Sequence, residues 1–225
     1  MPSTSHDSAA VYVIDDDVSF LKSVSRLLSA VGYTVQAFGS AEAFLNQLAP
    51  DMTGCIVADL QMPGMDGLKL QQALAKTTNP LPIIFLTGQG DIPTSVSAMR
   101  SGAEDFLTKR APKEDLLAAI ERALERDRIE RKERGRVQDL RHRFEDLSER
   151  ELEVLGHVVQ GKMNKEIAAY LNINERTVKL HRTNITRKLK VHSVAELTRL
   201  ADEAKLFDPG KESIPRAEGT FPKGQ

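Results

Sequence analysis

The sequence of 225 residues contains no tryptophan and a single cysteine, Cys55. One thiol cannot form a disulfide within the chain, so the class of small disulfide-stapled proteins is excluded. A lone cysteine also suits a reducing compartment. Aromatic residues make up only 5% of the chain, and we therefore expect hydrophobic cores built mainly from aliphatic side chains.

Long hydrophobic runs are also missing. Every apolar run is far shorter than the roughly 20 residues that a membrane-spanning helix needs. The amino-terminal segment MPSTSHDSAA is polar and has none of the features of a secretory signal. We therefore expect no membrane contact and a place in the cytoplasm.

The net charge of −1 conceals an uneven distribution. Residues 1–112 hold 11 acidic and 7 basic side chains, a net charge of −4, whereas residues 147–207 hold 8 acidic and 11 basic ones, a net charge of +3. Within 175–190, six lysines or arginines accompany one glutamate. This division indicates two domains with different partners.

The first 112 residues alternate short β-rich runs with segments of helical periodicity. Gly32 closes the first helical segment, and the apolar run CIVAD ends on Asp59. Five strands interleaved with helices predict an α/β fold with a five-stranded, doubly wound parallel sheet. The expected strands are 11–14, 35–38, 55–59, 82–87 and 105–108, and the expected helices are 18–31, 41–48, 68–75 and 94–101.

Residues 113–146 are expected to form a long charged helical linker, whose first part, 113–125, continues the α/β domain as its fifth helix. In 125–136, ten of twelve residues are charged, so we expect a solvated helix supported by ion pairs at i,i+4. Gly135 is its expected weak point. The linker either pairs with its copy in a dimer or stands alone as a solvated helix. The absence of a run of three heptads favours the second alternative. Residues 208–225, with Pro or Gly at six of eighteen positions, are expected to be disordered.

Residues 147–207 predict a small all-α domain. Ser148 followed by Glu151 is the pattern of a capping box, and Asn164 is expected to cap the next helix. A short turn at 172–174 then leads into a strongly basic helix at 175–189. Two helices joined by such a turn form a helix-turn-helix, whose second helix enters the major groove of double-stranded DNA.

The basic helix has two faces. The residues expected to face the core are Val178, Ile185 and Leu189. On the opposite face we expect Lys179, Leu180 and Thr183 to approach base edges. The residues expected to hold DNA phosphates, on this helix and the one before it, are Asn164, Lys165, Thr177, Arg182, Arg187 and Lys188.

Polar side chains gather at the carboxyl ends of the predicted strands, where open parallel sheets bind ligands. Asp15 and Asp16 follow the first strand, Asp59 ends the third, Thr87 ends the fourth and Lys109 follows the fifth. Three carboxylates brought together need a cation, and an oxygen-only ligand set favours Mg²⁺. This chemistry fits phosphoryl transfer to Asp59, with Lys109 as the phosphate partner and Thr87 as the hydroxyl that senses the product.

Four motifs resemble those of two-component receiver domains, which have a flavodoxin-like fold: VIDDD (13–17), DLQMPGMDG (59–67), LTGQGD (86–91) and SGAEDFLTK (101–109). The resemblance covers about 1–125. It implies that a partner sensor histidine kinase phosphorylates Asp59. It also implies that Asp15, Asp16, Asp59 and the backbone carbonyl of Gln61 surround Mg²⁺.

The resemblance further implies that Thr87 and Phe106 form a switch pair, in which the aromatic side chain changes its packing when the threonine engages the phosphate. Phe106 inside the core and Phe106 outside it are both open. One departure from the family is clear, because Arg110 stands directly after Lys109, where the family usually has proline. The turn into the fifth helix and the aim of Lys109 are therefore open questions.

Residues 147–200 resemble the LuxR-type helix-turn-helix through LSERELEVL, GKMNKEIAAYLNINERTVKLHRTNITRKL and VHSVAEL. The whole chain is similar to response regulators of the NarL/FixJ class. The resemblance implies a DNA-binding regulator, not an enzyme, whose phosphorylation promotes homodimerisation and transcriptional control. A fourth helix, about 193–204, is expected either to supply a dimer contact through Val194 and Leu197 or to pack in the core.

Two alternatives remain. A receiver kept only as a dimerisation scaffold would leave DNA binding independent of phosphorylation. A Mg²⁺-dependent phosphohydrolase with Asp59 as transient nucleophile would need a second acid two residues later, where Gln61 stands. Turnover of a phosphoester would support the second alternative, and equal DNA binding with and without a phosphodonor would support the first.

Overall fold

The computed structural model describes residues 9–88 and 92–207. The chain divides into two compact units, Met1–Lys132 and Glu133–Gln225. The tail at 208–225 that we expect to be disordered lies outside the described residues, and the domain limits drawn from the sequence remain predictions. In the described part of the chain, no helix is both long and apolar enough to cross a membrane.

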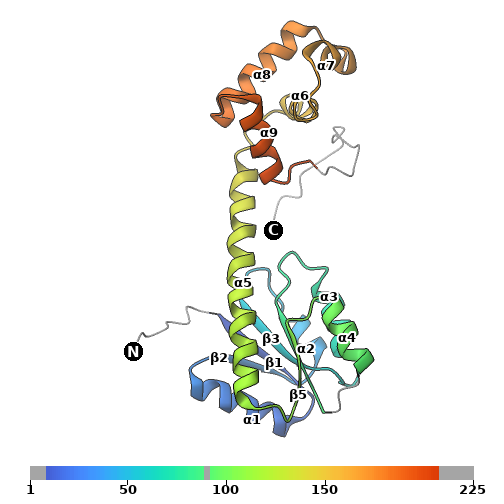
Figure 1. The fold of residues 1–225 in the computed structure, drawn as a ribbon, viewed down its shortest axis with the longest axis vertical. Helices are drawn as coiled ribbons and strands as arrows, with labels where there is room; N and C mark the ends of the chain where they lie inside the picture. Colours follow the sequence, from blue (N-terminus) through green and yellow to red (C-terminus); the bar gives the residue numbers. More distant parts are fainter. Residues whose placement is uncertain (1–8, 89–91, 208–225) are drawn as a thin grey trace. The chain divides into compact units, whose positions relative to one another are not determined.

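The first unit contains a five-stranded parallel sheet with the strand order β2-β1-β3-β4-β5, which confirms the predicted α/β architecture (Figure 1). The central strand β3 pairs in parallel with β1 on one side and β4 on the other. The strands are β1 (Ala10–Ile14), β2 (Thr34–Phe38), β3 (Gly54–Asp59), β4 (Ile83–Thr87) and β5 (Asp105–Thr108).

The side chains of the strands alternate between two hydrophobic cores, one on each face of the sheet. Cys55 and Val57 of β3 pack in the core formed with α1 (Val18–Val31) and α5 (Lys113–His142). Ile56 and Ala58 pack in the other core, which includes residues of α2, α3 and α4. Those three helices are α2 (Ala41–Leu45), α3 (Gly67–Leu74) and α4 (Ile92–Arg100). Because helices cover both faces, β3 and β4 are apolar up to their last residues, Asp59 and Thr87.

The ends of α1 and α2 show where the local sequence pattern predicted a helix boundary correctly and where it did not. Helix α1 begins after Asp17, whose side chain accepts from the N–H of Ser19 at 2.8 Å, and ends at Gly32 with φ of 106°. Helix α2 is three residues shorter than expected. The N–H groups of Gln47 and Leu48 bond to carbonyls three residues back, so the last expected turn is tighter than an α-helix.

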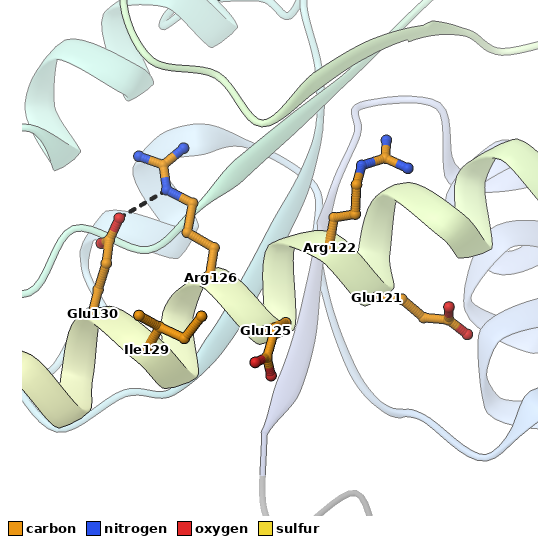
Figure 2. A pocket seen from close by; sticks show the side chains of 6 residues that line it. All are labelled: Glu121, Arg122, Glu125, Arg126, Ile129 and Glu130. Atoms are coloured by element: carbon orange, nitrogen blue, oxygen red, sulfur yellow. Dashed lines mark hydrogen bonds and ion pairs between the residues drawn. The ribbon is translucent and has the colours of Figure 1, made fainter.

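Helix α5 runs for 30 residues without a break, and the expected weak point Gly135 lies inside it. The division between the two units falls within this helix. Figure 2 shows a charged face of α5, where Arg126 pairs with Glu130 at 2.8 Å beside Ile129, which is 55% exposed. The expectation of a wholly solvated stretch is wrong at one position, because Asp127 is only 1% exposed.

The second unit contains α6 (Glu149–Val159), α7 (Asn164–Leu171), α8 (Glu175–Leu189) and α9 (Val194–Glu203). All four helices contribute side chains to one hydrophobic core, as the pattern predicted. Leu197 is 2% exposed and belongs to this core, whereas Val194 is 45% exposed. Of the two expectations for α9, core packing therefore holds for Leu197.

The capping box at the start of α6 is confirmed, with Ser148 N–H donating to Glu151 Oε2 at 2.8 Å. The prediction that Asn164 caps α7 is wrong. The capping position belongs to Met163, and its N–H donates to Glu166 Oε2 at 2.6 Å. The carboxylate of Glu166 thus satisfies the helix end without a polar cap side chain, and Asn164 is the first helical residue.

Candidate functional site

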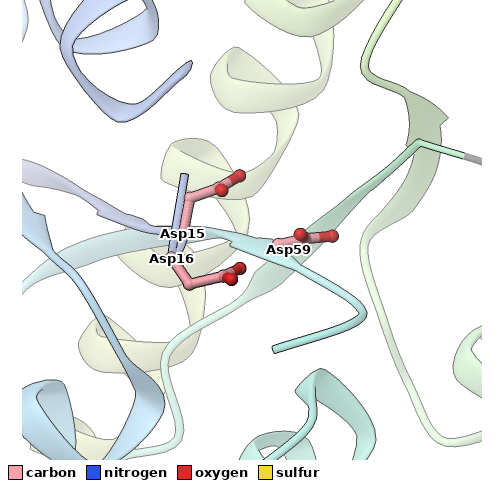
Figure 3. A group of neighbouring side chains, drawn as sticks. All are labelled: Asp15, Asp16 and Asp59. Atoms are coloured by element: carbon pink, nitrogen blue, oxygen red, sulfur yellow. The ribbon is translucent and has the colours of Figure 1, made fainter. Parts of the chain in front are cut away.

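The carboxyl ends of β1 and β3 bring three carboxylates together (Figure 3). Asp15, Asp16 and Asp59 each offer an oxygen, and these oxygens all lie within 4.8 Å of one another. Asp15 is 1% exposed and Asp59 is 7% exposed, whereas Asp16 is exposed to solvent. The adjacent positions of β1 and β3 in the sheet place residues from distant parts of the chain in one cluster.

Lys109 reaches this cluster from the end of β5. Its Nζ atom lies 2.7 Å from Asp15 Oδ2 and 2.9 Å from Asp59 Oδ2. The same ammonium lies 4.5 Å from the ring centroid of Phe20, a contact that the sequence did not suggest. Phe20 is the third residue of α1 and lies three residues after Asp17, so its spacing from the acids could have indicated an aromatic ring near the cluster.

The cluster carries more negative than positive charge. Burial raises the pKa of the Asp15 carboxyl, although the contact with Lys109 opposes this shift. Burial would lower the pKa of the Lys109 ammonium, but its hydrogen bonds to Asp15 and Asp59 raise it above the ordinary value. One ammonium against three carboxylates leaves two uncompensated negative charges when all are ionised. A divalent cation bound by oxygen atoms fits both this charge and this ligand set.

The backbone around the cluster explains the aim of Lys109 despite Arg110. The N–H of Lys109 donates to the carbonyl of Thr87 at 2.8 Å, and the N–H of Ala111 closes a turn on the carbonyl of Thr108 at 2.9 Å. Pro112 then begins the first turn of α5 through its carbonyl. The proline missing after the lysine is therefore not needed to direct the ammonium to Asp15 and Asp59.

The predicted switch residues lie on neighbouring strands. Thr87 at the end of β4 is 1% exposed. Phe106 on β5 is partly buried, and its ring centroid lies 6.5 Å from that of Phe85. Of the two positions left open for Phe106, the structure shows the ring packed at the edge of the core.

The loop after Asp59 is shaped by close contacts. The N–H of Gln61 donates to Asp59 Oδ1 at 3.3 Å. A Cβ atom at Gly67 would lie 2.7 Å from the ring of Phe85 and 2.8 Å from the carbonyl oxygen of Asp59. Only glycine fits there, so α3 can begin directly against the strand that carries Asp59.

The second unit presents the other predicted site on α8. Asn174 caps this helix by accepting from the N–H of Thr177 at 2.8 Å. Lys179, Leu180 and Thr183 are exposed, and the Leu180 side chain is 59% exposed although it is apolar. The residues expected at base edges therefore share an accessible face.

The residues expected to hold phosphates differ from one another in their present contacts. Lys165 and Arg187 are exposed. Arg182 donates to Asn164 Oδ1 at 3.0 Å, so these two are bound to each other across α7 and α8. The hydroxyl of Thr177 donates to Asn174 Oδ1 at 2.9 Å.

Lys188 is held by groups inside the second unit. Its Nζ atom donates to Glu151 Oε2 at 2.7 Å and to the carbonyl of Asp146 at 2.9 Å. Burial would raise the pKa of the Glu151 carboxyl, but Lys188 and Ser148 lower it below its ordinary value. Two of the three N–H donors of the Lys188 ammonium are therefore used inside the second unit, which leaves one donor for a phosphate.

Comparison with known proteins places both units. Residues 11–121 match the family model described as the response regulator receiver domain, and residues 145–201 match that of the bacterial regulatory proteins of the luxR family. The response regulator protein TodT of Pseudomonas putida is 42% identical over 198 residues, which cover 88% of this chain and 87% of TodT. The transcriptional regulatory protein FixJ of Bradyrhizobium diazoefficiens is 38% identical, with 88% of this chain and 97% of FixJ covered.

Solved structures agree with this assignment. The low-resolution structure of the response regulator StyR has a TM-score of 0.67 and 42% identity, covering 87% of this chain and 98% of that one. Full-length FixJ from B. japonicum has a TM-score of 0.53 and 38% identity, covering 89% and 99%. The chain therefore belongs to the two-component response regulators of the NarL/FixJ class, in which a receiver is joined to a LuxR-type DNA-binding domain.

Proposed function

We propose that Asp59 accepts a phosphoryl group from a partner sensor histidine kinase, and that the phosphorylated protein forms a homodimer on a two-fold DNA site to control transcription in the cytoplasm. The observation that carries this proposal is the position of Asp59, within 4.8 Å of two further carboxylates and 2.9 Å from Lys109. A single carboxylate paired with an ammonium beside an oxygen-rich cation site is suited to nucleophilic attack on phosphorus.

In this proposal Asp15, Asp16 and Asp59 hold Mg²⁺ together with the backbone carbonyl of Gln61. When bound, the cation would neutralise charge on the phosphoryl oxygens. The Asp59 oxygen forms a bond to phosphorus while the bond from phosphorus to the kinase's histidine nitrogen breaks, and that nitrogen keeps the electron pair. Lys109 then passes from the carboxylates to the new phosphoryl oxygens.

Thr87 and Phe106 report the change. The Thr87 side chain lies at the end of β4, next to the strand that carries Asp59, and would donate its hydroxyl to the phosphoryl group. Phe106 lies on β5 beside β4 and would repack when Thr87 moves. Such a step biases an existing equilibrium between two packings of the same side chains.

The phosphoacceptor is tested with a small phosphodonor and Mg²⁺. We expect the wild-type protein to be labelled and Asp59→Asn to remain unlabelled, measured by intact-protein mass spectrometry. The control is Asp66→Asn, because Asp66 is an acid of the same loop that caps α3 and asparagine also caps helices. Equal labelling of wild type and Asp59→Asn would refute the proposal.

The output is tested by DNA selection with phosphorylated and unphosphorylated protein at a stated salt concentration. We expect phosphorylation to enrich two-fold sites. Identical enrichment in both states would instead support the scaffold alternative, in which the receiver acts without phosphate.

A further inference from the structure

Asp127 is the unusual residue of the charged stretch 125–136. Ten of the twelve side chains there are charged, yet Asp127 is 1% exposed. A buried carboxylate is costly unless hydrogen bonds and a counter-charge compensate it. The groups that bind this carboxylate therefore indicate which contact its burial stabilises.

Asp127 binds the start of the central strand. Its Oδ2 atom accepts from the N–H of Gly54 at 3.0 Å and from Arg131 Nε at 2.9 Å. Gly54 begins β3 with φ of 128°, and a Cβ there would lie 1.8 Å from the carbonyl oxygen of Ala10. The N–H that Asp127 receives is thus presented by a backbone conformation that only glycine adopts.

The carboxyl end of β3 also contacts the segment that leads into α5. Asp59 ends β3 and pairs with Lys109, which stands four residues before α5 begins. The segment from Lys113 to Asp127 is about 21 Å long as a helix, at 1.5 Å per residue. From Gly54 to Asp59 the strand spans about 17 Å, at 3.3 Å per residue. These lengths allow one helix to be held near both ends of one strand.

We propose that Asp127 is a positioning residue that anchors α5 to the start of β3, so that α5 as far as Arg131 moves with the receiver and passes on its phosphorylation state. The division between the two units, after Lys132, follows the last residue of this anchor. The transmission rests on the proposed phosphorylation of Asp59. In that event Lys109 leaves Asp59 for the phosphate at one end of β3, while the contact with Gly54 holds the other end of the helix.

Cys55 provides a native reporter of the anchor. It follows Gly54, it is fully buried, and it is the single thiol of the chain. We expect Asp127→Ala to raise the rate of Cys55 labelling by N-ethylmaleimide at least about fivefold, because a buried N–H loses its partner. Asp127→Asn keeps an acceptor oxygen and should label more slowly than Asp127→Ala.

The matched control is Glu125→Ala, which removes the exposed pair between Glu125 and Arg128 from the same helix. This control should label like wild type. Hydrogen exchange of the peptide containing Gly54 checks the same opening by a second method. Where Asp127→Ala is too unstable to purify, Cys55 labelling and hydrogen exchange of Asp127→Asn decide the question. Unchanged labelling and unchanged exchange in Asp127→Asn and Asp127→Ala would overturn the anchor.

Transmission is read from the ratio of DNA affinities with and without phosphodonor. We expect Asp127→Ala to accept phosphate on Asp59 like wild type, while its affinity ratio falls toward one. Glu125→Ala should keep the wild-type ratio. A wild-type ratio in Asp127→Ala, with the anchor shown to be open, would overturn the regulatory role. If the wild-type protein itself accepts no phosphate, the proposed function fails, and the Cys55 and hydrogen-exchange results still decide the anchor.

Discussion

His157 is fully buried in the second unit, beside the ammonium of Lys162. Its Nδ1 atom lies 3.1 Å from Lys162 Nζ, and its ring packs edge-on against Tyr170 with centroids 4.5 Å apart. A lysine ammonium only donates, so Nδ1 accepts and the imidazole is neutral. Burial lowers the pKa of His157, and the charge of Lys162 lowers it further, while Gln160 and Glu153 oppose the shift.

At the residue scale, this geometry predicts acid sensitivity of the second unit. Because the pKa of His157 is lowered in the folded state, the unfolded state binds more protons below about pH 6.5. Stability that is present above that pH is therefore lost as the pH falls. Hydrogen exchange of α6 and α7 at pH 7.5 and 5.5, corrected for intrinsic rates, measures this loss of stability. His157→Leu should reduce the difference, whereas His142→Gln, at an exposed histidine, should not.

A second prediction at this scale concerns Gly67. Alanine there would collide with Phe85 and with the backbone of Asp59, so we expect Gly67→Ala to lower the free energy of unfolding by about 1–3 kcal/mol. We also expect slower phosphate labelling, since the loop after Asp59 must shift. Gly39→Ala is the control, because a Cβ at Gly39 meets nothing within 4 Å. Equal stability of the two variants in thermal melts would contradict this reasoning.

Single residues were predictable where local order was enough. Asp15, Asp59 and Lys109 each stand at the end of a strand, so the parallel sheet brings them together. The burial of Asp127 was not predictable, because its partner is a backbone N–H 73 residues away. The cap assigned to Asn164 was wrong because the carboxylate of Glu166 closes the helix one position earlier.

At the scale of the element, we expect two adjacent cations of α8 to differ in role, one contributing to DNA binding and the other to stability. Both residues are exposed, but Arg187 bonds to Asn184, whereas Lys188 compensates the buried carboxylate of Glu151. We expect Lys188→Ala to lower the free energy of unfolding by about 2–3 kcal/mol, because Glu151 loses its counter-charge. Arg187→Ala should leave stability nearly unchanged and reduce the slope of log affinity against log salt by about one.

Thermal melts and DNA titrations at several salt concentrations distinguish the two variants. A stable Lys188→Ala protein with a reduced salt slope would show that Lys188 binds phosphate after all. The periodicity that identified α8 placed Val178, Ile185 and Leu189 in the core. It could not tell which lysine points back toward α6, because Glu151 lies 37 residues earlier.

Other elements show the same limit. The β-rich runs of the strands, Gly32 at the end of α1 and the capping box of α6 sufficed to predict these elements. Helix α2 ended early, and α5 continued through Gly135, because turn geometry and tertiary support override single-residue propensity.

At the scale of the whole molecule, the uneven charge and the proposed dimer make a joint prediction. A two-fold DNA site bound by two copies engages about twice as many phosphates as a half-site. We therefore expect the salt slope of the phosphorylated protein on a two-fold site to be about double its slope on a half-site. Asp59→Asn, treated identically, should show similar slopes on both. Similar slopes for the phosphorylated wild type would argue against a dimer on DNA.

Every side chain of β3 from Cys55 to Ala58 is enclosed by one of the two cores, with at most 1% exposed. A strand so confined leaves little freedom for mutation, and a one-residue slip would exchange its two faces and carry Asp59 away from its partners. The outward face of α8, which we expect to contact DNA, has no such constraint. Descendants of this chain can therefore acquire new target sequences while the input chemistry stays as it was inherited.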